Sequence, residues 1–256
     1  MNNTKYYSLF VILLLTLCGG ASAASSLGPA IDKAGSQRML TQRMVKAYAL
    51  LGMDLNPGAR GELNAALTRF DKQLKELSKV AETSEENEQI DKTRLLWSEL
   101  RTELLNAPDA SRIGQVNDLA ELLLQESHQF VLLLEKRAGT QAGGMVNLAG
   151  RQRMLSQRIA KLYLLETWGM DAALVQQQYQ GAVDEFSTAL IQLHGAKINT
   201  AEITDALSQV DKNWKIFNIS NYSKKYNTRV PSLVVRSMDK IMAQMNDVTA
   251  MYANLH

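Results

Sequence analysis

The chain has 256 residues, 46% of them hydrophobic, which is enough for one large domain or two small ones. Its formal net charge of +2 lacks the basic surplus of nucleic-acid-binding domains, so nucleic acid is not an expected partner. Only 4 prolines are present, and Leu, Ala, Gln, Glu and Lys are common, so the composition favours an all-α fold.

The first 23 residues have the features of an export signal. Lys5 supplies a positive charge, an apolar run ends at Cys18, and Ala21–Ala23 offers the small residues that a signal peptidase accepts. The apolar run is far shorter than the ~20 residues that a membrane-spanning helix needs. Lipidation at Cys18 is disfavoured because Leu17 stands where a small residue is required. We therefore expect cleavage after Ala23 and a periplasmic protein.

The rest of the chain has the pattern of helices separated by short breaks. Apolar residues recur at three-and-four spacing, and clusters of Pro, Gly, Asn, Asp and Ser mark the breaks. Strands are hard to place anywhere. The predicted helices cover residues 31–53, 60–80, 89–105 and 113–137, then 145–169, 172–195, 201–219 and 230–254.

One segment occurs twice. "AGSQRMLTQRMVKAY" at 34–48 returns as "AGRQRMLSQRIAKLY" at 149–163, and Trp97 has a counterpart in Trp214. A weaker similarity pairs residues 123–131 with 240–248. The chain is therefore a tandem repeat of a unit of about 115 residues. Four helices per unit, joined by short loops, predict two tandem four-helix up-and-down bundles.

The expected organisation is a signal peptide at 1–23, a first helical unit at 24–138, a Gly-rich junction at 139–145 and a second unit at 146–256. The junction fits either a flexible linker or a helix that continues from one unit into the next. The first helices of the two units are candidates to pack on each other as a pseudo-dimer within one chain.

The repeated motif predicts an anion site. On a helix, Gly35, Arg38 and Gln42 share one face. A glycine there costs the helix about 1 kcal/mol relative to alanine, and it lets another backbone approach closely. If the two first helices pack, Arg38 meets Arg153, and two facing guanidinium groups need an anion, for which planar oxyanions suit the arginine fork. The predicted site residues are Arg38 and Arg153 as ligands, Gln42, Gln157, Gly35 and Gly150 as shaping residues, and Arg43 and Arg158 as secondary contacts or ion pairs.

The same residues also have a purely structural interpretation. An arginine on a helix is usually solvated or in a surface ion pair that contributes little to stability. Duplication alone places any motif in the chain twice, and a shared core requirement would preserve Met39 and Leu40. From the residues alone, both interpretations stay open.

A family resemblance bears on this choice. "AIDKAGSQRMLTQRM" (30–44) resembles the first helix of periplasmic sensor domains in NarX-type nitrate/nitrite sensor kinases. "VNLAGRQRMLSQRIAKLY" (146–163) is similar to the first helix of PilJ-type domains, which open chemotaxis transducers linked to type IV pili. The resemblance implies a four-helix sensor bundle with nitrate or nitrite bound between Arg38 and Arg153. Because Ser36 corresponds to Arg151, we expect an asymmetric site.

The resemblance also implies partners. Members of these families normally carry transmembrane helices and a kinase or methyl-accepting domain, which we do not find in this sequence. We therefore expect a membrane-bound sensor kinase or chemotaxis transducer as partner. The leading hypothesis is an exported sensor or accessory protein that binds a small oxyanion, nitrate or nitrite. The alternative is a structural or interaction module that docks on a membrane receptor or signalling protein without a small ligand.

Other chemistries find little support. His128, His194 and His256 lie far apart, and Cys18 is the only cysteine, so no metal site or other cofactor is expected. No paired carboxylates, nucleophile–base arrangement or phosphate-binding glycine loop is present, so we do not expect an enzyme. Trp168, near the end of a predicted first helix, is a candidate docking residue.

Overall fold

The computed structural model describes residues 27–221 and 230–255. The predicted signal peptide and most of the loop before residue 230 lie outside these residues. Within them every element is helical and no strand occurs, which confirms the all-α prediction. The elements are α2 (Gly28–Gly52), α3 (Ala59–Leu77), α4 (Ser84–Leu105), a short 3-10 helix η1 (Ala110–Arg112), α5 (Ile113–Ala138), α6 (Gln141–Thr167), α7 (Ala172–His194), α8 (Ala201–Asn221) and α9 (Pro231–Ala253).

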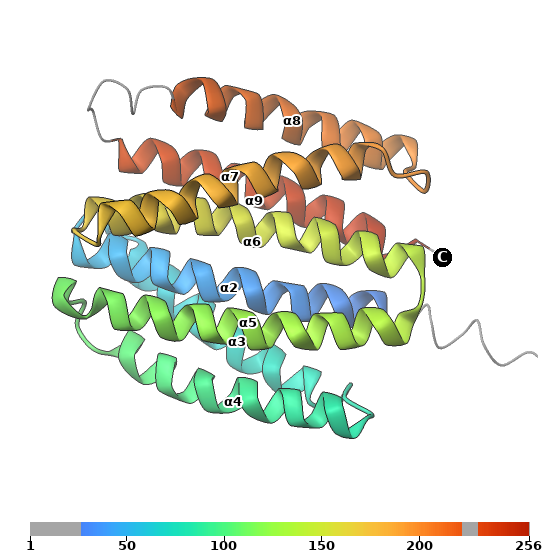
Figure 1. The fold of residues 1–256 in the computed structure, drawn as a ribbon, viewed down its shortest axis with the longest axis horizontal. Helices are drawn as coiled ribbons and strands as arrows, with labels where there is room; N and C mark the ends of the chain where they lie inside the picture. The colour runs from blue at the N-terminus through green and yellow to red at the C-terminus, as the bar shows by residue number, and fades with distance from the viewer. Residues whose placement is uncertain (1–26, 222–229, 256) are drawn as a thin grey trace, which may run out of the picture.

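The helices form two bundles that share a central seam (Figure 1). Helices α2 to α5 make the first bundle, and α6 to α9 make the second, each with its first helix packed on its second and fourth. Helix α2 also packs along α6, and it contacts α9, while α5 contacts α6. The expected pseudo-dimer through the two first helices is therefore what the structure shows.

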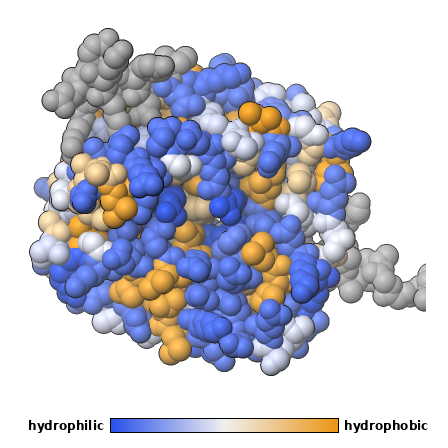
Figure 2. Space-filling view, in the orientation of Figure 1, coloured by the Kyte–Doolittle hydropathy of each residue, from blue (hydrophilic) through white to orange (hydrophobic). Residues whose placement is uncertain are grey.

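The central helices are buried on nearly every side. Almost all residues of α2 between Ala30 and Leu50 are buried, and so are most residues of α6 between Val146 and Leu165. The outer helices instead show polar residues to solvent, and hydrophobic residues form only small separate groups on the face in Figure 2. Because burying an unpaired polar group is costly, every polar residue of the repeated motif needs a partner in the interior.

The connection between the units is a tight turn. Helix α5 ends at Ala138, and Gly139 follows with φ 60, the left-handed conformation that favours glycine after a helix. The side chain of Thr140 then accepts a hydrogen bond from the backbone N–H of Gly143 and caps α6. Residues 141–145, expected to belong to a junction, form the first turns of α6. The chain therefore has neither a flexible linker nor a continuous helix here.

The aromatic cores of the two bundles match. The rings of Phe70 and Trp97 have centroids 4.2 Å apart, and those of Phe186 and Trp214 lie 4.1 Å apart. The two units therefore share their internal packing as well as their helix order.

Trp168 is partly buried against the core, just after the end of α6 and beside α2. Its ring centroid lies 6.1 Å from that of Tyr48. A Cβ atom on Gly52 would lie only 2.1 Å from the indole, so this glycine makes room for the tryptophan. Trp168 thus contributes to the packing between the two units, and its role as a docking residue stays a prediction.

Candidate functional site

Two glycines create the gap at the centre of the seam. A Cβ atom on Gly35 would lie 4.0 Å from the Cα of Gly150. The same Cβ would lie 3.3 Å from Nη2 of Arg38 and 3.4 Å from Nη2 of Arg153. The absence of side chains at these positions therefore lets α2 and α6 approach, and both guanidinium groups lie in the space that results.

Arg153 receives a counterion from the chain itself. Its Nη2 lies 2.6 Å from the carboxylate Oδ1 of Asp32 and donates to the carbonyl oxygen of Asp32 at 3.1 Å. Its Nη1 donates to Oδ1 of Asn246 at 3.1 Å. Burial lowers the pKa of Arg153, and the Asp32 carboxylate acts in the opposite direction. The cation is thus buried but compensated.

Arg38 has the same kind of environment without the carboxylate. Its Nη1 lies 2.9 Å from Nδ1 of His128, and its Nη2 donates to the carbonyl oxygen of Asn147 at 3.3 Å. Arginine has only donors, so His128 accepts through Nδ1. In the described part of the chain, no carboxylate lies within ion-pairing distance of Arg38, and its Nε has no hydrogen-bond partner.

The charge on Arg38 is held at a cost. Its pKa is lowered from 12.5 to about 9, mainly by burial and then by the positive charges of Arg151 and Arg153. Glu135 and Glu185 act in the opposite direction without contacting the guanidinium. At neutral pH Arg38 remains a cation, and an anion beside it would relieve both the desolvation and the repulsion.

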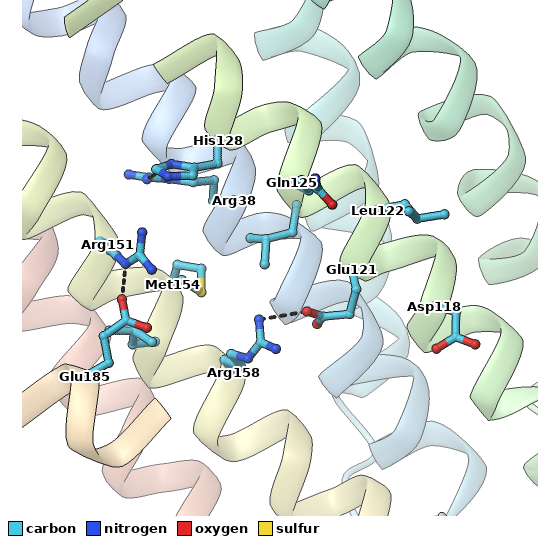
Figure 3. A pocket seen from close by; sticks show the side chains of 12 residues that line it. Arg38, Asp118, Glu121, Leu122, Gln125, His128, Arg151, Met154, Arg158 and Glu185 are labelled. Atoms are coloured by element: carbon cyan, nitrogen blue, oxygen red, sulfur yellow. Dashed lines mark hydrogen bonds and ion pairs between the residues drawn. The ribbon is translucent and has the colours of Figure 1, made fainter. Parts of the chain in front are cut away.

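A pocket of about 560 Å³ gives access to Arg38 between α5, α6 and α7 (Figure 3). Arg38, His128 and Arg151 line one part of it, and Arg151 forms an ion pair with Glu185 there. Burial, followed by the charges of Arg38 and Arg151, lowers the pKa of His128 to about 4. The imidazole is therefore neutral at pH 7, and the two arginines supply the positive charge.

The two predicted glutamines make equivalent contacts away from the arginines. Nε2 of Gln42 donates to Oε1 of Glu121 at 3.3 Å, and Nε2 of Gln157 donates to Oδ1 of Asp239 at 2.9 Å. In each case the acceptor lies on the fourth helix of the same unit. The structure thus gives the glutamine amides a role in holding first and fourth helices together.

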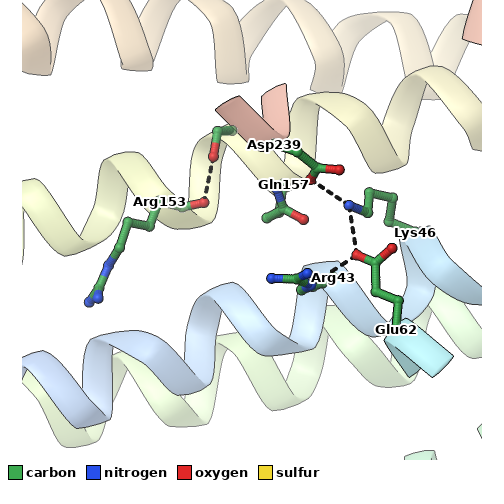
Figure 4. Close-up of polar contacts among 7 residues, drawn as sticks. Arg43, Lys46, Glu62, Arg153, Gln157 and Asp239 are labelled. Carbon is green, nitrogen blue, oxygen red and sulfur yellow. Dashed lines mark hydrogen bonds and ion pairs between the residues drawn. The ribbon is translucent and has the colours of Figure 1, made fainter. Parts of the chain in front are cut away.

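Two lysines that sequence reasoning had not singled out cross the seam. Nζ of Lys46 lies 2.6 Å from Asp239 of the other unit, and Nζ of Lys161 lies 2.6 Å from Glu121 (Figure 4 shows the Lys46 side). Both lysine side chains are fully buried. Burial tends to raise the pKa of Glu121, but Lys161 and Arg158 outweigh it and lower the pKa to about 2. The sequence signal that could have identified these lysines is their presence at equivalent positions in both copies of the motif.

The predicted secondary arginines form ion pairs. Nε of Arg43 lies 2.9 Å from Glu62, and Nη1 of Arg158 lies 2.8 Å from Glu121. Arg43 therefore takes its partner from the second helix of its own unit, whereas Arg158 reaches across to the fourth helix of the other. This part of the motif is built differently in the two copies.

The buried contacts correct the alignment of the fourth helices. Glu121 and Asp239 play the same part, and so do His128 and Asn246, each pair being 118 residues apart (239 − 121 and 246 − 128). The sequence match of 123–131 with 240–248 used an offset of 117, one residue too few. The apolar pattern alone was too weak to fix this register.

Two further properties concern the described residues alone. They contain no group of three or more His, Cys, Asp or Glu side chains arranged to hold a metal ion. None of their helices is long and apolar enough to cross a membrane.

Comparison with known proteins identifies a family. No curated protein and no solved structure gives a significant match. A family model, described as the N-terminal region of type IV pili methyl-accepting chemotaxis transducers (PilJ), matches residues 21–120 and 139–220. One matched segment covers α2 to α4 and the start of α5, the other covers α6 and α7 and nearly all of α8, and together they span well over half of the chain. The chain therefore belongs to the PilJ family of chemotaxis-transducer N-terminal domains.

Proposed function

We propose that this protein binds a small planar oxyanion, nitrate or nitrite, at Arg38. One observation carries the proposal: Arg38 is only 1% exposed, contacts no carboxylate among the described residues, and faces a pocket beside a second arginine. A buried cation without a counterion is costly, and an anion that enters the pocket would offset that cost.

The expected affinity is modest. Nε of Arg38 has no partner among the described residues, and Arg151 adds donors at the same pocket. Two or three charge-assisted hydrogen bonds would contribute roughly 1.5–3 kcal/mol each. A micromolar dissociation constant needs about 8 kcal/mol. We expect micromolar binding or weaker, with the rigid seam holding Arg38 in place for the anion.

The biological setting of the proposal is the periplasm. The predicted signal peptide at 1–23 supports export, and the PilJ family supports a part in chemotaxis signalling. The bound state would be read by a membrane-bound transducer or sensor kinase. The protein would act by binding rather than by catalysis.

A thermal-shift screen tests this function. The mature protein, from Ala24 onward, would be heated with nitrate, nitrite, chloride, sulfate or small carboxylates at matched ionic strength. A bound anion raises the unfolding free energy by RT ln(1 + [L]/Kd). We expect a rise with nitrate and nitrite that Arg38→Lys loses, because an ammonium lacks the planar fork. Arg43→Lys, on the same helix but paired with Glu62, is the matched control and should keep the rise.

The panel also separates the alternatives. A rise with carboxylates alone would exclude nitrate and keep an anion site at Arg38. A flat panel, with unchanged stability at millimolar anion, would reject the proposed function and favour a module that docks on a signalling protein through its surface.

A further inference from the structure

The two central arginines occupy equivalent positions whose neighbours differ. Asp32 and Asn147 are 115 residues apart, as are Arg38 and Arg153 (147 − 32 and 153 − 38). Each arginine donates from Nη2 to the backbone carbonyl of the other unit's residue, Arg38 to Asn147 and Arg153 to Asp32. The backbone geometry of the seam is therefore duplicated, and the side chains at 32 and 147 make the difference.

These two side chains point to different partners. The carboxylate of Asp32 lies 2.6 Å from Nη2 of Arg153. The amide of Asn147 donates instead to the carboxylate of Glu135, and its Oδ1 has no hydrogen-bond partner among the described residues. One arginine thus receives a full negative charge from across the seam, and the other receives only a carbonyl dipole.

We propose that Asp32 is a built-in anion that occupies the Arg153 half of a pseudo-twofold site, so that the chain takes a single external oxyanion, on the Arg38 side. The inference rests on the proposed function and deepens it by fixing the number and the place of the ligands.

The charge balance of the seam supports this assignment. Two guanidinium groups share one gap, and burial destabilises the charged form of each, which lowers the pKa of both arginines. Asp32 neutralises one of the two charges, which leaves one for a ligand. The Asp32 side chain is 32% exposed, so its position reflects attraction to Arg153 more than burial. Because it is tethered, it acts at a high effective concentration, and a free anion competes poorly for Arg153.

The surroundings of the two halves also differ in charge. Beside Arg38, Arg151 forms an ion pair with Glu185, and the carboxylate of Glu135 accepts a hydrogen bond from the side-chain amide of Asn147. Beside Arg153, Arg69 adds a positive charge that lowers its pKa. The carboxylate of Asp32 therefore compensates the Arg153 half, and the Arg38 half keeps a pocket that solvent ions can enter.

Exchanging the two residues tests the inference. Asp32→Asn copies the Arg38 half, and the double variant Asn147→Asp/Glu135→Ala copies the Arg153 half, since Ala253 is the counterpart of Glu135 (253 − 135 = 118). Sodium nitrate would be titrated into each purified protein by calorimetry, with circular dichroism to check folding. We expect one nitrate per chain for the wild type, two for Asp32→Asn, and at least a tenfold loss of affinity for the double variant.

The outcomes separate this inference from the proposed function. One nitrate in Asp32→Asn together with undiminished binding by the double variant would overturn the role of Asp32 and leave Arg38 as the site. Binding by Asp32→Asn but not by the wild type would overturn the site at Arg38 and support Asp32 as the resident anion. No binding by any of the folded proteins would overturn both. If Asp32→Asn does not fold, the double variant alone decides.

Discussion

The Arg38 and Arg153 halves of the seam differ far less in backbone than in charge. Both arginines come from the same repeated motif, lie in the same glycine gap and bond to equivalent carbonyl groups. Only Arg153 has a carboxylate, from Asp32, within ion-pairing distance in the described structure. A duplicated scaffold can thus keep its backbone geometry while a single acidic side chain changes the charge at one of the two copies.

The ion pairs of the two buried lysines, Lys46 and Lys161, show a second asymmetry. Lys46 contacts two carboxylates, Asp239 at 2.6 Å and Glu62 at 2.9 Å. Lys161 contacts one, Glu121, and shares it with Arg158. Removing one acid should therefore have unequal consequences on the two sides.

The largest effect is expected for Glu121→Gln. This change leaves the buried Lys161 without a carboxylate, and breaking a buried pair in this way costs about 3–5 kcal/mol. We expect about 3 kcal/mol from urea unfolding, because Glu121 is 24% exposed and Asn117 still accepts from Lys161. Asp239→Asn is the matched variant and should cost clearly less, since Lys46 keeps Glu62. Equal losses would contradict the asymmetry.

Alkaline pH should weaken anion binding by roughly tenfold between pH 8 and 10. The pKa of Arg38 is lowered to about 9, so the cation that attracts the anion is lost as pH rises through that value. Calorimetric titration of nitrate across this range measures the change. A constant affinity up to pH 11 would show that Arg38 keeps its ordinary pKa or does not bind the anion.

Gly35→Ala should destabilise the fold by about 1 kcal/mol and reduce the anion-induced shift. The added methyl group would crowd both Nη2 atoms at 3.3–3.4 Å, which outweighs the gain in helix propensity. Gly181→Ala, in α7 with nothing within 4 Å of the new Cβ, is the control and should stabilise by up to about 1 kcal/mol. If nitrate raises the melting temperatures of Gly35→Ala and Gly181→Ala by similar amounts, the gap at Gly35 is not needed for anion binding.

The smallest expected effect concerns acid pH. His128 has a pKa lowered to about 4 from 6.5, so the unfolded chain binds the extra proton first, and stability falls as pH drops through that window. His128→Asn copies Asn246 of the other half and should remove this slope, worth at most about 1 kcal/mol after screening by solvent. Unfolding curves at pH 7, 5.5 and 4.5 test it, and the same slope in His128→Asn as in the wild type would argue against a neutral, partly buried His128.

The sequence allowed the fold to be predicted almost completely, because its signals are local. Helical periodicity and the breaks between helices placed the eight long helices of the described residues within about five residues of their observed bounds. The glycine one turn before each arginine pointed to close packing of α2 on α6, and Arg38 and Arg153 do meet there. The duplication supplied the overall arrangement.

The partners of the motif could not be predicted in the same way. His128 and Asn246 are chemically unlike, although they play the same part, so their correspondence is invisible in the letters. Lysine on a helix is usually solvated, and nothing local signals that Lys46 and Lys161 are fully buried. Asp32 and its counterpart Asn147 have side chains of the same shape that differ in charge. The sequence alone does not show that Asp32 contacts Arg153 across the seam.

The most direct test of the account is a crystal structure of the mature protein grown with sodium nitrate. We predict one nitrate in the pocket against the guanidinium group of Arg38, with Arg151 beside it and Asp32 still paired with Arg153. A nitrate held symmetrically between both arginines with Asp32 displaced, or nitrate bound at neither arginine at saturating concentration, would contradict it.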